Sequence, residues 1–183
     1  MSLSACVYCD CLERNKVPSP LPPNATLQIS ADGYPSLVCN GRTIDEDDPD
    51  WEDFKCEHEH RMLMFKQLGN ISMIGLIRTE LEAQPSRFPT LLAKVVYNGT
   101  HGGDWLPVDD FPALESELAA LEHFECHATR PKSRFSRLPW RWFKLGKYHY
   151  TGPEESALFV AEFRDQMSEL LSCARTVGKP ICF

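Results

Sequence analysis

Six metal-binding side chains, gathered in two short stretches, constrain the fold of this chain more than any other feature of its sequence. The stretch CVYCDC near the start and the later stretch CEHEH contain Cys6, Cys9, Cys11, Cys56, His58 and His60. One tetrahedral zinc ion needs only four such ligands. An ion held by both stretches therefore requires a fold that brings two distant parts of the chain together.

The spacing allows more than one ligand set. A closed structural set of three thiolates and one imidazole consists of Cys9, Cys11, Cys56 and His58. Cys6 with Cys9 is equally permitted as the first half of a site, and His60 is an alternate in the second half. The competing interpretation is that CEHEH is a polar loop that continues the acidic run over residues 45–59.

The eight cysteines allow two interpretations of the compartment, a secreted disulfide framework or reduced thiols with a metal. The first residues contain no apolar stretch typical of a secretory signal, so we expect a reduced, cytoplasmic protein. No apolar run has the length needed to span a bilayer, which predicts no membrane segment. The net charge of −7 argues against a general nucleic-acid binder.

Hydrophobic spacing and turn residues predict an α+β fold, with a small mixed or antiparallel sheet and about three helices. We expect one domain over residues 1–183, within which residues 1–60 can form a zinc-stabilised N-terminal subdomain. Asp32-Gly33 is a favoured hairpin turn, and Ser72 is a candidate helix cap. The predicted elements are a strand before the cysteines, a hairpin over 26–39, helical turns in 60–68, a helix from Ser72 to before Pro85, a strand over 91–97, a helix from about Asp110 with Phe111, Leu114, Leu118 and Leu121 buried, a helix over 154–177 with Leu158, Phe163, Met167, Leu170 and Leu171 buried, and a last strand over 181–183.

A basic and aromatic segment over residues 130–150 is the candidate partner-binding surface. Trp140, Arg141 and Trp142 lie at its centre, and these residue types dominate protein–protein hot spots. The partner would then present an acidic surface. Two alternatives remain open: the segment can pack on the acidic residues 45–59 of its own chain, or stack on single-stranded nucleic acid.

His101, followed by two glycines and Asp104, is compatible with a catalytic or anion-binding loop, although a tight turn is the simpler interpretation. The chain contains no nucleophile elbow, HExxH or GxGxxG motif. An enzyme with a metal- or thiol-dependent site at the cysteine and histidine cluster, or around His101, is therefore the alternative function.

Several short motifs carry a resemblance to known families. CDC near the start, a proline-rich stretch, an acidic segment with a tryptophan, CEH, NIS before a helix, FPTL and a Gly-Gly loop resemble a family of small uncharacterised bacterial proteins. The later half is similar to immunity proteins of bacterial polymorphic-toxin systems. The similarity lies in the 102–105 loop leading into the 114–121 helix, and in the last helix ending at Cys173-Ala174 before residues 178–181.

The resemblance implies a cytosolic, non-enzymatic protein that binds a protein partner, such as a toxin with an acidic surface. Within the cluster it favours Cys9, Cys11, Cys56 and His58 as the zinc ligands. A closed set of four protein ligands would favour this binding function, whereas an open fourth position holding water would favour the enzyme.

Overall fold

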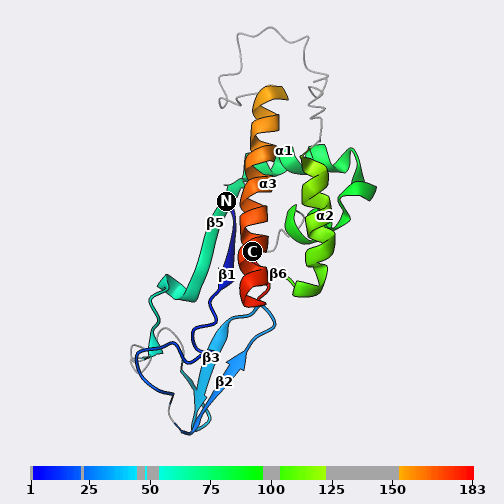
Figure 1. Cartoon of the computed structure of the whole chain (residues 1–183). Helices are drawn as coiled ribbons and strands as arrows, with labels where there is room; N and C mark the ends of the chain where they lie inside the picture. Colours follow the sequence, from blue (N-terminus) through cyan, green and yellow to red (C-terminus); the bar gives the residue numbers. More distant parts are fainter. Residues whose placement is uncertain (1, 22, 45–47, 49–53, 97–103, 123–152) are drawn as a thin grey trace.

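The first and last strands of the chain pair with each other in a four-stranded antiparallel sheet. Part of this sheet is seen beside the long C-terminal helix in Figure 1. A computed structural model describes residues 2–21, 23–44, 48, 54–96, 104–122 and 153–183. The strand order is β5-β1-β7-β6. The strands are β1 (Ser2–Tyr8), β5 (Met62–Asn70), β6 (Trp105–Leu106) and β7 (Ile181–Cys182). The predicted first and last strands are thus confirmed.

Among the described residues, three helices form the main core with this sheet. They are α1 (Ile71–Glu82), α2 (Phe111–Leu121) and α3 (Pro153–Val177); α1 and α3 pack on the sheet, and α2 packs on α3. The predicted stripe of α2 is buried, α1 buries Ile74, Ile77 and Leu81, and the α+β class is confirmed. The cap of α1 is Asn70 rather than Ser72: its side chain accepts hydrogen bonds from the N–H groups of Ser72 and Met73, both at 3.0 Å. Leu158 was expected in the core but is 68% exposed. Ser156 and Val160, two residues to either side of it, are buried, so Leu158 lies on the solvent-facing side of α3.

Residues 62–70 form β5 and not the helical turns that their apolar spacing predicted. The strand pairs with β1 along most of its length, so that Met64 lies opposite Val7 and both face the core. Long-range pairing with another strand outweighs a weak local preference for helix.

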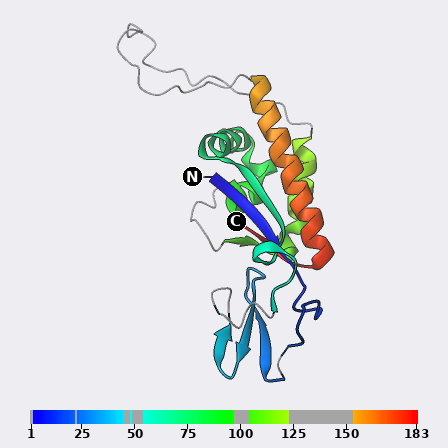
Figure 2. The same cartoon turned by 90° about the vertical axis from the view of Figure 1, so that its left-hand side faces the viewer.

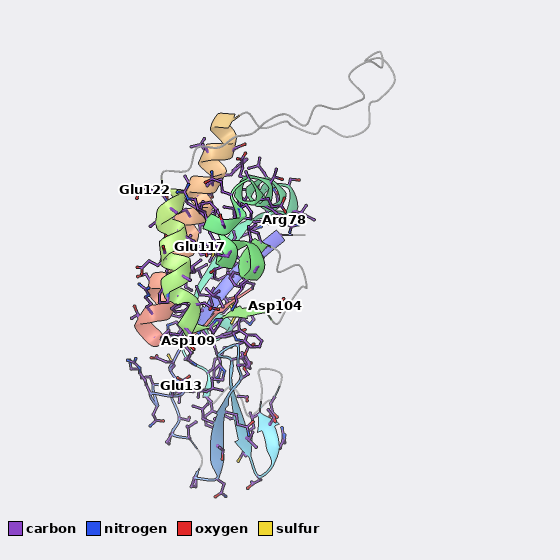
Figure 3. All side chains as sticks on the ribbon, turned by 90° about the vertical axis from the view of Figure 1, so that its right-hand side faces the viewer. Glu13, Arg78, Asp104, Asp109, Glu117 and Glu122 are labelled. Carbon is purple, nitrogen blue, oxygen red and sulfur yellow. The ribbon has the colours of Figure 1, made fainter. Side chains whose placement is uncertain are left out.

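Residues 91–96 were expected in a strand but form a short π-helical segment, which the 3₁₀ turn η3 (Pro85–Arg87) precedes. A further 3₁₀ turn, η5 (Val108–Asp110), lies between β6 and α2. Side chains from other elements hold both ends of the π-helical segment (Figure 3). The buried Glu117 of α2 accepts hydrogen bonds from the N–H groups of Thr90 and Leu91 at 2.8 Å each. At the other end, Arg78 of α1 donates to the carbonyl oxygen of Val96 at 2.5 Å. A carboxylate at the N-terminus and a guanidinium at the C-terminus both complement the helix dipole.

A second, three-stranded antiparallel sheet lies at the other end of the molecule (Figure 2). Its strands are β2 (Ala25–Ile29), β3 (Pro35–Cys39) and β4 (Arg42–Ile44), and the β2–β3 pair is the hairpin predicted around Asp32-Gly33. A small separate core lies beneath it, consisting of Leu12, Leu37, Ile44 and Phe54. The described residues therefore form two sheets where one was expected.

The β2–β3 turn joins the small sheet to the C-terminal strand of the large one. The buried Lys179 donates to the carbonyl oxygen of Gly33 at 3.1 Å and pairs with the Glu13 carboxylate. Gly33 has φ +84°, and a Cβ there would lie 2.9 Å from the ring of Pro180. Glycine is therefore required by both the turn and the close packing.

Candidate metal centre

The two halves of the cysteine and histidine cluster meet where the chain leaves β1 and where it enters β5. Cys9 follows β1 directly, and its N–H donates to the carbonyl oxygen of Arg61 at 2.8 Å. A tight turn then follows, in which the N–H of Lys16 donates to the carbonyl oxygen of Cys11 at 2.7 Å. Both thiols of this first half are buried.

The second half lies between Phe54 and the 3₁₀ turn η2 (Glu59–Arg61). His60 and Arg61 both have left-handed backbone, with φ of 47° and 57°, which turns the chain sharply into β5. The buried Arg61 donates from Nη2 to the carbonyl oxygen of Phe54 at 3.5 Å, so the Arg61 side chain connects the two ends of the segment over 54–61. Nothing in the local sequence around Arg61 marks an arginine that becomes buried, so its role depends on the fold.

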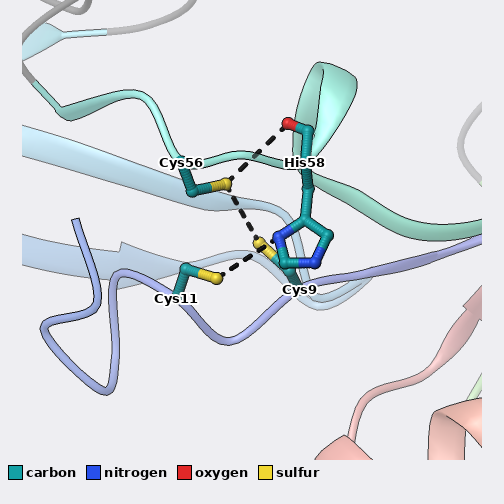
Figure 4. Close-up of side chains that lie close together, drawn as sticks. All are labelled: Cys9, Cys11, Cys56 and His58. Atoms are coloured by element: carbon teal, nitrogen blue, oxygen red, sulfur yellow. Dashed lines mark hydrogen bonds between the residues drawn. The ribbon is translucent and has the colours of Figure 1, made fainter. Parts of the chain in front are cut away.

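The four side chains converge on one point (Figure 4). The ligand atoms of Cys9, Cys11, Cys56 and His58 all lie within 4.8 Å of one another. The Sγ atoms of Cys9 and Cys56 are 3.6 Å apart, and Cys11 Sγ is 3.4 Å from Nδ1 of His58. These four residues are close enough to bind one metal ion.

Two of the separations between ligand atoms are close to the edges of a zinc tetrahedron. With Zn–S and Zn–N bonds of about 2.3 and 2.05 Å, a tetrahedral ion places two sulfurs about 3.8 Å apart and a sulfur and a nitrogen about 3.6 Å apart. The separations of 3.6 and 3.4 Å between the two pairs of ligand atoms are close to these values. Because His58 presents Nδ1 to the cluster, its other nitrogen, Nε2, carries the proton when the ring is a neutral ligand.

The environment of the thiols links metal binding to proton release. Burial raises the pKa of the Cys9 thiol to about 12 and also raises the pKa of Cys11. The backbone N–H of Cys11 opposes this shift by donating to the Cys9 sulfur, which stabilises its thiolate. Three thiolates and a dication leave a net charge of about −1 at the site. Arg14, Lys16 and Lys55 line the adjoining surface hollow together with the acidic Asp10 and Glu57, and Arg14 pairs with Asp10.

The alternate ligands lie elsewhere. Cys6 lies within β1, beside Cys182 of β7, and is not among the four clustered residues. His60 is exposed in η2 and is likewise outside the cluster. The proposed partner-binding residues Trp140, Arg141 and Trp142, and the loop at His101, lie outside the residues that the structure describes.

Comparison of the chain with protein-family models, with curated proteins and with solved structures gave no match. The resemblance to immunity proteins therefore stays an expectation. Within the described part of the chain, no helix combines the length and the apolar character needed to cross a bilayer.

Proposed function

We propose that this chain is a bacterial cytoplasmic interaction protein, immunity-like, in which one zinc ion has a structural role. The observation that carries the proposal is the convergence of Cys9, Cys11, Cys56 and His58, in which two pairs of ligand atoms lie near the spacing of a zinc tetrahedron. Four protein ligands complete the coordination of zinc, so water and substrate have no position on the ion. Such a site favours a binding protein over a metal-dependent enzyme.

The donor set supports zinc over other metals. Thiolate and imidazole ligands at tetrahedral spacing suit zinc, whereas magnesium and calcium prefer oxygen ligands in larger coordination shells. Zinc is also redox-inactive, which suits a site whose role is to hold the chain.

The position of the cluster supports a structural role. The ion would join the end of β1 to the start of β5, and the whole three-stranded sheet lies in the chain between these two points. The core beneath that sheet contains four buried apolar side chains. Units with so small a core commonly depend on a bound metal or a disulfide.

The proposed partner is a protein with an acidic surface, such as a toxin, and the proposed contact residues are Trp140, Arg141 and Trp142. Their residue types support the assignment, because tryptophan and arginine are enriched at binding hot spots. If a neighbouring gene encodes a toxin, co-expression of this chain should protect the host cell. Trp140→Ala with Trp142→Ala should abolish the protection, while Trp105→Ala, which alters a tryptophan exposed on β6, should not.

Cobalt substitution distinguishes the binding protein from the enzyme. Cobalt(II) bound by three thiolates and an imidazole should give the strong visible absorption of a four-coordinate thiolate site, and Cys56→Ser should change it while Cys39→Ser does not. Azide or cyanide should leave the spectrum unchanged. A spectral shift on adding either anion would reveal an open position on the metal and would favour the enzyme.

A further inference from the structure

The outer face of the four-stranded sheet, opposite the helices, carries one row of side chains that crosses all four strands. Phe65 of β5 lies opposite Cys6 of β1, Cys6 lies opposite Cys182 of β7, and Cys182 lies opposite Trp105 of β6. Directly opposed residues in an antiparallel sheet point to the same face. Two cysteines from the two ends of the chain are thus neighbours at the centre of this row.

The backbone geometry at this pair suits a disulfide. Directly opposed residues in antiparallel strands have Cα atoms about 4.5 or 5.5 Å apart, depending on their hydrogen-bonding position. Disulfides span Cα separations of about 4.4 to 6.8 Å, so either arrangement permits the bond without moving the backbone. Both residues are free thiols in the structure.

The two thiols differ in a way that assigns them different roles. Cys182 is 8% exposed, and its Sγ donates to the carbonyl oxygen of Asp32 at 2.8 Å. Cys6 is only partly buried, so a reagent reaches its sulfur more easily than that of Cys182. The more accessible Cys6 is therefore the better nucleophile.

A surface hollow of about 210 Å³ opens onto the pair. Its walls include Tyr8, Asp32, Phe65 and Phe183 together with both cysteines. A small disulfide can reach Cys6 through this hollow, while the buried Cys182 is protected from direct attack.

We propose that Cys6 and Cys182 are a modification site, at which a low-molecular-weight disulfide such as oxidised glutathione forms a reversible intramolecular disulfide. The Cys6 thiolate attacks one sulfur of the oxidant, forms a mixed disulfide and releases one glutathione thiolate. Cys182 then loses its proton and attacks the Cys6 sulfur, which releases the second glutathione. Two protein thiols are oxidised and one glutathione disulfide is reduced to two thiols.

The bond would join the first strand of the chain to the last. The loop that it closes contains nearly the whole chain, and long loops give the largest stabilisation in the chain-entropy account of disulfides. Neither cysteine belongs to the candidate metal centre, so the modification is separable from zinc binding.

The test uses the full chain with zinc bound, treated with oxidised glutathione. We expect two thiols to be lost, zinc to be retained, and peptide mapping to identify a Cys6–Cys182 link. The melting temperature should rise by on the order of 5 to 10 °C and return with dithiothreitol. Cys39→Ser and Cys173→Ser are matched controls that should behave like the parent.

Single variants test the order of attack. Cys182→Ser should trap the mixed disulfide on Cys6, whereas Cys6→Ser should take up little or no glutathione at Cys182. The proposal is overturned if the parent forms only mixed disulfides, if the mapped link involves Cys9 or Cys56, or if Cys6 does not react. Mass measurement under native conditions gives these answers even if a variant is less stable than the parent.

Discussion

Metal removal should loosen the small sheet and its flanking loops while the helical core stays closed. The two cores share no buried side chain, and the cluster lies at the junction between the segment over 9–61 and the large sheet. Any opening that separates Cys9 from Cys56 must break the site. Opening of α3 alone does not involve the cluster.

The magnitude follows from binding linkage. At free zinc one hundred times the dissociation constant, the bound ion stabilises the closed state by about 2.7 kcal/mol, which is roughly a hundredfold in the opening equilibrium. A chelator should therefore lower the hydrogen-exchange protection of the Cys9, Lys16 and Arg61 amides by up to about a hundredfold. These amides form the hydrogen bonds at 2.7 to 3.1 Å that surround the cluster.

Hydrogen exchange followed by mass spectrometry, on zinc-loaded protein with and without the chelator, makes the measurement. Amides of α3 around Phe163 and Leu170 are the internal control, because both side chains lie in the main core. Unchanged protection at Cys9 and Arg61 would refute the reasoning. An equal loss along α3 would show that the two cores open as one unit.

Three further predictions concern the core and the chemistry of the site. Glu117→Gln should lower the free energy of unfolding in urea by about 1–3 kcal/mol, because a glutamine amide cannot accept both hydrogen bonds that the Glu117 carboxylate accepts from the backbone N–H groups of Thr90 and Leu91. Glu122→Gln, the same change at the exposed C-terminal end of α2, should have little effect. Leu170→Ala should cost about 2–5 kcal/mol by leaving a cavity, whereas Leu158→Ala should stay within about 0.5 kcal/mol; equal effects would contradict the orientation of α3. Burial raises the pKa of Cys9 to about 12, so zinc must displace the proton of this thiol at neutral pH. Competition titrations should therefore show the apparent zinc affinity falling at least tenfold for each unit by which the pH is lowered below about 8. An affinity that does not change with pH would exclude thiolate ligation.

The parts of the fold that the sequence predicted are those with strong local patterns. The stripe of α2 repeats at helical spacing from Phe111 to Leu121, and the Asp32-Gly33 turn marks the hairpin. These features depend on residues close in sequence, so the chain alone reveals them.

The incorrect predictions involve segments whose structure depends on distant partners. β5 is a strand because it pairs with β1, and residues 91–96 are helical because Glu117 and Arg78 hold their two ends. A local pattern does not contain the side chain that arrives from another element. Propensity is a weak guide wherever tertiary contacts decide the backbone.

Among the cysteines, too, local spacing predicted one group of neighbours and missed another. The spacing of Cys9 with Cys11 and of Cys56 with His58 indicated two pairs of ligands, which the fold brings together. The Cys6 and Cys182 pair was not foreseen, because it depends on the register between the first and last strands. Sequence spacing identifies ligands held by a tight turn but not a pair created by strand register.

The most direct test of the central claim is the metal content of the purified protein. Elemental analysis of chain produced with zinc available, combined with native mass spectrometry, should find about one zinc ion per chain. Cys56→Ser should lower this content, while Cys39→Ser should leave it unchanged. Parent protein without bound metal, or disulfides among Cys9, Cys11 and Cys56, would contradict the account.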